Sequence, residues 1–180
     1  MVSFFKGGDF VEINNSLPII DYSDNETGCC PKFHPENWDE KIFNFDELKF
    51  IKASTKSFMY MPINMSSVMT KTMADIHNAK AETTEQYLIL SKDVSKWKCD
   101  HYFLVASDVP SYENLALNGN YYAKVYDGAF KELPKWMTEF EGLLKKKGYN
   151  SNDMMAFYTT CPKCASHYGH NYIVLFSKVS

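Results

Sequence analysis

Apolar and polar residues alternate between positions 50 and 60, and this period of two predicts a long β-strand. Pro62 ends the strand, and Asn64 is a suitable residue to cap a helix. Two shorter strands are predicted at 87–90 and 101–107. The helix is predicted because apolar residues recur three and four positions apart, at Met65, Val68, Met69, Met73 and Ile76.

The second half of the chain repeats this order of elements. A strand is predicted at 115–126 and a helix at 133–147, with Pro134 in its first turn and Gly148 at its end. Strands at 154–160 and 171–179 follow. On the strand at 115–126 we expect one set of side chains to face the helix and the other set to face away. The first set is Leu115, Leu117, Tyr121, Ala123 and Val125, and the second is Asn118, Asn120, Tyr122, Lys124 and Tyr126.

The repeated order predicts an α+β fold made of two strand–helix–strand–strand units related by pseudo-two-fold symmetry. Residues 101–109 and 171–179 also share Tyr, Ser and Val at matching positions, which supports an internal duplication. We expect an antiparallel sheet with the helices on one face, and a cleft between the repeats on the other. The predicted organisation is an N-terminal covering segment at 1–45 and a domain at 46–180, with repeats at 46–110 and 111–180.

Several short motifs indicate a family. Gly119-x-Tyr121 with Tyr126-Asp127-Gly128, and Phe157-Tyr158 on the penultimate strand, resemble the GyrI-like or AraC-effector-binding small-molecule domain over about residues 47–180. Cys29-Cys30-Pro-Lys-Phe and Cys161-Pro-Lys-Cys164 are similar to motifs of a bacterial branch loosely labelled hydrolases. The resemblance implies binding of a cationic or aromatic compound, in some members through a Glu on the penultimate strand. Ala156 stands near that position here, so no such carboxylate is expected.

Charge and composition narrow the classes of function. All 19 basic residues are Lys and the formal net charge is -3, which disfavours a protein that reads nucleic-acid sequence through Arg contacts. The sequence contains no apolar stretch long enough for a membrane helix and no signal peptide, so we expect a cytoplasmic protein without a membrane partner. Five cysteines, an odd number, argue against a secreted disulfide framework.

The cysteines themselves are candidate ligands. Cys161-Pro-Lys-Cys164 is typical of a zinc knuckle and equally of a dithiol redox motif. Zinc needs two further ligands, either Cys29 and Cys30 or the nearby pair His167 and His170. We favour the four cysteines, and we expect Cys29, Cys30, Cys161 and Cys164 to meet in space. Unmetallated thiols, or a nucleophilic Cys29 or Cys30 activated by Lys32 or His34, stay open as alternatives.

Aromatic residues form the second candidate site. We expect them to line the cleft and to bind a planar or cationic organic ligand. These residues are Phe58, Tyr60, Trp97, Tyr122, Tyr126 and Tyr158. The alternative is that the N-terminal segment covers this surface with its own apolar side chains, Phe33, Trp38, Ile42, Phe43 and Phe45.

The sequence therefore predicts a small-molecule-binding protein, acting as a monomer or homodimer. The first alternative is a hydrolase of a small electrophile that uses a Cys, a Tyr or an acid, for which the neighbouring Asp39 and Glu40 are candidates. The second alternative is a thiol redox protein or a zinc-dependent sensor.

Overall fold

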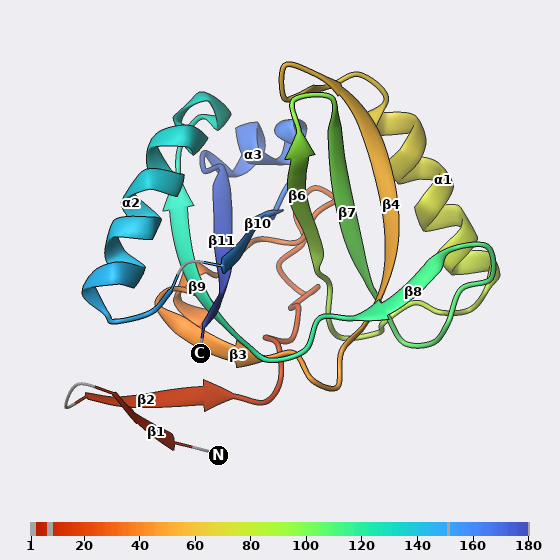
Figure 1. Ribbon diagram of the computed structural model, residues 1–180. Helices are drawn as coiled ribbons and strands as arrows, with labels where there is room; N and C mark the ends of the chain where they lie inside the picture. The colour runs from red at the N-terminus through yellow and green to blue at the C-terminus, as the bar shows by residue number, and fades with distance from the viewer. Residues whose placement is uncertain (1–2, 7–8, 151, 180) are drawn as a thin grey trace. The chain divides into compact units, whose positions relative to one another are not determined.

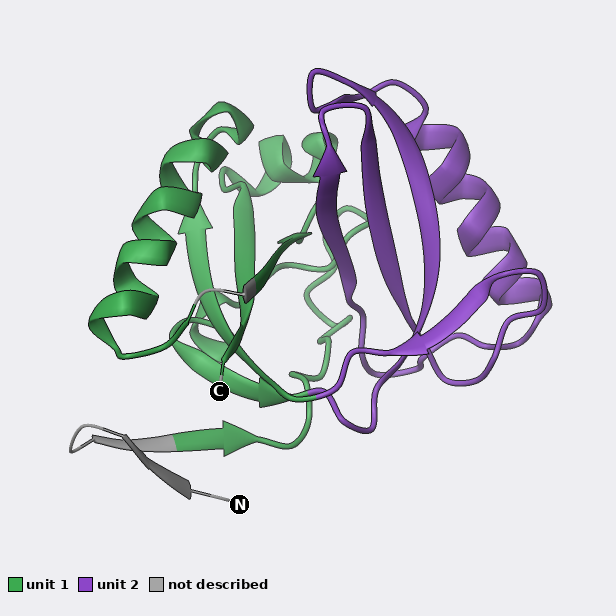
Figure 2. Cartoon of the chain, viewed as in Figure 1, with its two compact units in different colours: residues 1–44, 119–180 green, residues 45–118 purple. Residues whose placement is uncertain are grey.

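The structure, a computed structural model, describes residues 3–6, 9–150 and 152–179 (Figure 1). Its contacts divide the chain into two compact units, shown in different colours in Figure 2. Unit 1 contains residues 1–44 and 119–180, and unit 2 contains residues 45–118. Unit 2 is thus continuous in sequence and is inserted into unit 1. Among the described residues, no helix has the length and apolar character needed to cross a membrane.

Unit 2 is an antiparallel sheet with one helix. Its strands lie in the order β6-β7-β4, formed by β6 (Ile89–Ser95), β7 (Lys98–Val105) and β4 (Lys49–Phe58). Two short strands, β5 (Met61–Pro62) and β8 (Glu113–Ala116), also pair with β4. Helix α1 (Met65–Asn78) packs Met69 and Ile76 against Ile51 and Phe103 of the sheet. Of the predicted helical stripe, Met69 and Ile76 face the sheet, whereas Met73 is 41% exposed.

Unit 1 has the same core arrangement. Its strands lie in the order β10-β11-β9, formed by β10 (Asn152–Tyr158), β11 (Tyr172–Val179) and β9 (Asn120–Asp127). Helix α2 (Leu133–Lys146) packs Trp136 and Phe140 on this sheet. Additional strands from the N-terminal part extend it beyond β9: β3 (Lys41–Asn44), β2 (Asp9–Asn14) and β1 (Ser3–Lys6).

The duplication is visible when the units are compared element by element. β4, α1, β6 and β7 of unit 2 correspond to β9, α2, β10 and β11 of unit 1, in both chain order and sheet order. In each unit the last strand lies between the other two and is antiparallel to both. The prediction of an α+β fold with an antiparallel sheet is confirmed.

Some predicted elements are corrected. The expected strand at 115–126 is two strands, β8 and β9, interrupted at Gly119, whose φ of +102° favours glycine. The connection expected between the last two strands contains helix α3 (Pro162–Tyr168). The covering segment at 1–45, for which no regular element was predicted, contains the 3-10 turn η1 (Pro35–Asn37) and the strands β1, β2 and β3. A second 3-10 turn, η2 (Phe130–Glu132), precedes α2.

Candidate metal centre

Four cysteine side chains from two distant parts of unit 1 meet at one point. Cys29 and Cys30 lie in the loop between β2 and η1, Cys161 precedes α3, and Cys164 lies in its first turn. Their sulfur atoms all lie within 4.8 Å of one another. The expected convergence of these four residues is confirmed, and all are free thiols in this structure.

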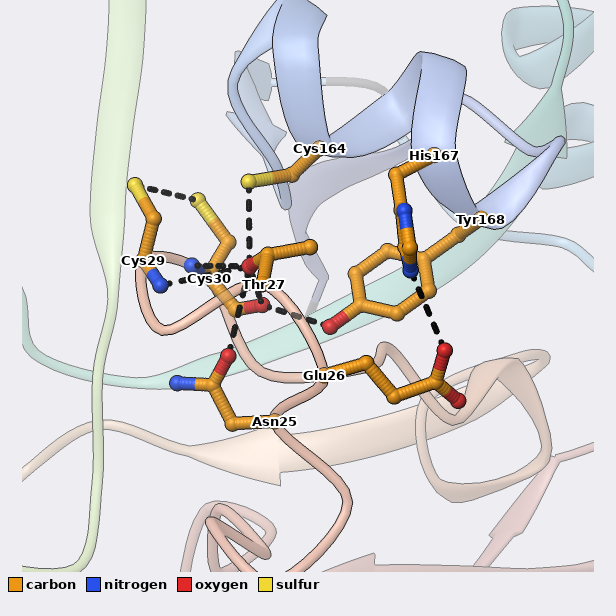
Figure 3. A network of polar contacts seen from close by, with 8 residues as sticks. All are labelled: Asn25, Glu26, Thr27, Cys29, Cys30, Cys164, His167 and Tyr168. Carbon is orange, nitrogen blue, oxygen red and sulfur yellow. Dashed lines mark hydrogen bonds and ion pairs between the residues drawn. The ribbon is translucent and has the colours of Figure 1, made fainter.

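A tight turn brings the two adjacent cysteines onto one side of the chain. In an extended strand their side chains would point in opposite directions. Here Gly28 has a φ of +64°, and the Thr27 hydroxyl accepts hydrogen bonds of 3.2 Å from the backbone N–H groups of both Cys29 and Cys30. As Figure 3 shows, the two sulfurs lie side by side, and their separation is 3.8 Å. Thr27 is therefore the residue that shapes this half of the cluster.

Helix α3 supplies the other half and is tied to the same loop. The Cys161 N–H points to Cys30 Sγ at 3.5 Å, and the Tyr168 hydroxyl donates to the Cys30 carbonyl at 2.9 Å. Cys164 Sγ lies 3.3 Å from Thr27 Oγ1, and His167 Nε2 lies 3.1 Å from a Glu26 carboxylate oxygen (Figure 3). The loop and the helix are thus joined by several polar contacts beside the sulfurs.

The geometry fits a tetrahedral metal ion. Zn–S bonds of about 2.3 Å place the sulfurs of a four-thiolate site about 3.8 Å apart. The Cys29 and Cys30 sulfurs have this separation, and all four sulfurs lie within 4.8 Å of one another. The Thr27 hydroxyl lowers the pKa of Cys164 to about 6, whereas burial raises the pKa of Cys30 to about 12. A cation at the centre would favour the thiolate form of all four.

The histidine alternative has less geometric support. His167 is engaged with Glu26, and His170 Nδ1 lies 2.6 Å from Asp127 Oδ2. Neither histidine belongs to the group of ligand atoms that converge among the described residues. The four-cysteine set is therefore the one that the structure brings together.

Two of the six aromatic residues expected to bind ligand lie beneath α2. Tyr122 is 2% exposed and stacks on Phe140, and Tyr126 stacks on Trp136 with ring centroids 5.3 Å apart. The expectation that this face of the strand points away from the helix is wrong. Both faces of β9 are buried, as the neighbouring Tyr121 (3% exposed) shows, so the alternation of residues did not reveal which face meets the helix.

The opposite face of the same strands is covered by the N-terminal segment. Trp38 contacts Phe157 of β10 and Phe176 of β11, with ring centroids 5.6 and 6.1 Å apart. Phe33 lies against Phe157 and Tyr172. These contacts make an aromatic layer of unit 1 that is separate from the one under α2.

The other four aromatic candidates divide between the two units. Phe58, Tyr60 and Trp97 of unit 2 are 61%, 55% and 50% exposed, and the rings of Phe58 and Trp97 are 5.5 Å apart. Tyr158 is half-buried in unit 1, where it packs against the same core cluster as Tyr122 and contacts Phe130. The ligand-binding role of the six residues stays a prediction, but Tyr122 is enclosed by the core.

An acidic pair noted in the sequence has basic partners that the sequence did not reveal. Lys124 Nζ lies 3.0 Å from an Asp39 oxygen and 3.1 Å from a Glu40 oxygen, and Lys147 reaches Glu40 at 3.5 Å. Asp39 also accepts a 2.9 Å hydrogen bond from the backbone N–H of Val125. Hydrogen bonding from Lys124 lowers the pKa of Glu40.

Comparison with known proteins places this α+β fold in a family. The model of the family described as bacterial hydrolase (Bact_hydrolase) matches residues 20–179, and the chain belongs to this family. No curated protein matches the sequence.

Two solved structures match this chain in a comparison of structures. An uncharacterized conserved protein from Listeria innocua shares 11% identity, with a TM-score of 0.57 over 79% of this chain and 94% of that chain. The structure of SAV2435 bound to tetraphenylphosphonium shares 11% identity, with a TM-score of 0.49 over 78% of this chain and 93% of that chain. At this level of identity, the likeness to the Listeria innocua protein concerns the fold alone.

Proposed function

We propose that Cys29, Cys30, Cys161 and Cys164 bind one zinc ion, which fastens the loop before η1 to helix α3. The observation that carries the proposal is the convergence of the four sulfur atoms within 4.8 Å. Four soft thiolate ligands in a tetrahedral arrangement favour zinc or an iron–sulfur cluster over magnesium or calcium. The sulfur spacing suits a single tetrahedral ion, and zinc is the ion that structural sites of four cysteines ordinarily hold.

The proposed role of the zinc is structural. Four protein ligands leave no open position for water or substrate, and an open position is what catalytic zinc sites retain. The loop that carries Cys29 and Cys30 leads directly to Phe33 and Trp38, which cover one face of the unit 1 sheet. Zinc would thus hold the start of this covering segment in place.

Metal analysis of protein purified in reducing buffer without chelators tests the proposal. We expect about one zinc per chain, because the four ligands form one site. Cys164→Ser should lose the metal, whereas Cys99→Ala, which changes the one cysteine of unit 2, should retain it. Wild-type protein that contains no zinc and binds none when zinc is added would contradict the proposal. Four thiols that instead form disulfides reversibly would favour the redox alternative.

A second candidate is binding and hydrolysis of a small organic molecule, which the family description suggests. The observation that favours it is the group formed by Glu40, Lys124 and Lys147. Hydrogen bonding from Lys124 lowers the pKa of Glu40, so this carboxylate stays ionised and can orient a water molecule for attack. The two lysines would favour a substrate whose oxygen atoms carry or develop negative charge during hydrolysis. Such a substrate differs from the cationic compound that the resemblance implies.

Substrate screening tests this second candidate. A panel of small esters and epoxides should include one that is hydrolysed, and Glu40→Gln should slow turnover by about 100-fold or more. Glu139→Gln is the matched control, because Glu139 lies on the exposed side of α2 and pairs with Lys135. Equal turnover by Glu40→Gln and wild type would remove Glu40 from the reaction.

A further inference from the structure

Two neighbouring turns of unit 2 expose large apolar side chains at one end of its sheet. The turn between β4 and β5 exposes Phe58, Met59, Tyr60 and Met61 by 54–61%, and the turn between β6 and β7 exposes Trp97 by 50%. Other exposed apolar residues nearby in sequence are Ile63 and Val94. Both turns lie at the same end of the unit in Figure 1. We call the seven residues the apolar tip.

Backbone contacts fix the two turns to each other. The Ser57 N–H donates to the Trp97 carbonyl at 2.8 Å, and the Tyr60 N–H donates to the Lys96 carbonyl at 3.1 Å. The rings of Phe58 and Trp97 meet at 5.5 Å. The apolar tip is therefore one surface built on paired strands.

The residue types in the first turn conflict with its backbone. Phe58 pairs with Met61, so Met59 and Tyr60 form a two-residue hairpin loop with φ values of +49° and +68°. Hairpin loops with two positive φ values strongly prefer Asn-Gly or related pairs, because bulky residues are strained there. A sequence selected for folding alone would not place Met and Tyr at these positions. Their exposed, apolar side chains therefore point to a partner.

The charges around the apolar tip indicate what that partner is. Residues 54–63 and 92–100 contain four lysines and two aspartates, an excess of two positive charges in a chain whose net charge is -3. Lys56, Lys96 and Lys98 are exposed, and Lys56 pairs across the strands with Lys98. One aspartate, Asp100, is 7% exposed and is engaged by Lys98 at 3.0 Å and by Ser54 at 2.6 Å.

We propose that the apolar tip docks on an anionic lipid bilayer, inserting Phe58, Met59, Tyr60 and Trp97 at the level of the headgroups. Convex turns present their apolar side chains outward together, which suits a fluid surface. Trp and Tyr rings favour the membrane interface, and Lys side chains extend to anionic headgroups while their stems stay on the apolar side. Attachment of this kind needs no membrane-spanning helix.

Vesicle binding by the full-length protein tests the proposal. We expect co-sedimentation with vesicles of phosphatidylcholine containing phosphatidylglycerol, and weaker binding to phosphatidylcholine alone. Trp97 reports insertion, because Trp38 and Trp136 are only 5% and 7% exposed. Its emission should shift to shorter wavelength on binding, and Trp97→Phe should lose that shift. Equal binding to both kinds of vesicle, or binding to neither, would overturn the proposal.

A turn replacement separates docking from folding. Met59→Asn with Tyr60→Gly installs the pair that the loop geometry prefers, so thermal stability should be kept or raised. The partition coefficient onto anionic vesicles should fall by about 10-fold or more, because the two side chains that insert into the bilayer are lost. Ile19→Ser with Tyr22→Ser is the matched control, since these residues are exposed in unit 1 and should not affect binding.

Two further outcomes decide against the proposal. If the turn replacement bound vesicles as tightly as wild type, the apolar tip would not be the contact with the membrane. Light scattering after size-exclusion chromatography provides the other check. A wild-type dimer that becomes a monomer on turn replacement, with no vesicle binding by either, would assign the apolar tip to contact between two copies of the chain.

Discussion

In unit 1, Tyr126 near the end of β9 stacks on Trp136 beneath α2, whereas the corresponding strand of unit 2 ends at Phe58, which is 61% exposed beside Trp97. The two units have the same order of elements and the same order of strands. One uses its strand-end aromatic residue to fill a core, and the other presents it to solvent. Two units with the same backbone arrangement can therefore use residues at matching positions differently. Whether such a residue packs in a core or contacts solvent depends on what covers it in each unit.

The largest expected effect comes from deleting residues 1–44, the part of unit 1 that precedes unit 2. The deletion removes Phe33, Trp38 and Phe43, and the loss of one buried aromatic side chain costs about 3–5 kcal/mol. The sum approaches the whole stability of a typical domain, about 5–15 kcal/mol. Unit 1 should lose its packing, as dye binding and near-ultraviolet circular dichroism will measure.

Hydrogen exchange in the truncated chain then sharpens the comparison between units. Amides of β7 in unit 2 should stay protected, while amides of β11 in unit 1 should exchange fast. A chain lacking only residues 1–12 is the control, because it retains every aromatic contact named above. Wild-type protection of β11 after the longer deletion would contradict the prediction.

A pair of tryptophan substitutions compares the two units residue by residue. Trp136→Ala should destabilise the protein by about 3–5 kcal/mol, because its ring is 7% exposed and packs on Tyr126. Trp97→Ala should cost less than about 1 kcal/mol, because its ring is 50% exposed. Urea denaturation measures both. Equal losses would show that Trp97 is as important to packing as Trp136.

Acid should destabilise unit 2 through a buried histidine. His101 is 0% exposed, with Thr55 Oγ1 at 2.9 Å from Nε2 and Ser91 Oγ at 2.9 Å from Nδ1. Burial lowers its pKa from 6.5 to about 4, although Asp100 opposes the shift. The unfolded chain therefore binds the proton first as pH falls, so stability from the neutral ring is present above pH 6.5 and is lost between pH 6.5 and 4.

The expected loss over this range is on the order of 3 kcal/mol. Urea denaturation at several pH values measures it, and His101→Gln provides the comparison because its amide does not titrate. The variant should be less stable than wild type at pH 7.5 and should show a flatter dependence between pH 6.5 and 4. Parallel pH curves for the two proteins would show that His101 does not titrate in this way.

The smallest expected effect concerns the turn that shapes the cysteine cluster. Thr27→Val removes the hydroxyl that accepts from the Cys29 and Cys30 N–H groups, at a cost of about 1 kcal/mol. Zinc affinity should fall by about 10- to 100-fold, as is usual when a group supporting metal ligands is lost. Competition with a chelator measures the affinity, and Thr27→Ser should restore it. Wild-type affinity in Thr27→Val would exclude a supporting role for the hydroxyl.

The sequence predicted α1 and α2 well because apolar residues recur three and four positions apart in both. α1 begins at the expected Met65, and α2 covers residues 133–146 of the expected 133–147. The cysteine cluster was predictable because paired cysteines with Pro and Lys form a recognisable motif. Local patterns of this kind identify a helix or a candidate metal-binding residue, even when the residues that it contacts are distant in sequence.

The parts that could not be predicted depend on contacts distant in sequence. Tyr121 and Tyr122 are both buried, so no alternation marks which face of β9 meets α2. Helix α3 spans only seven residues and follows a Cys-Pro pair that equally suits a turn. Thr27 resembled any other polar loop residue until the structure placed its hydroxyl beside Cys164.

The insertion of unit 2 into unit 1 sets an order for synthesis on the ribosome. Residues 45–118 form a continuous unit that can fold while the chain is still emerging, whereas unit 1 must wait for residues 119–180. Cys30 meets Cys161 across a separation of 131 residues, so the first two thiols are made long before their partners. The four-cysteine cluster can therefore assemble only after residue 164 has been made, and until then Cys29 and Cys30 have no partner thiols from α3.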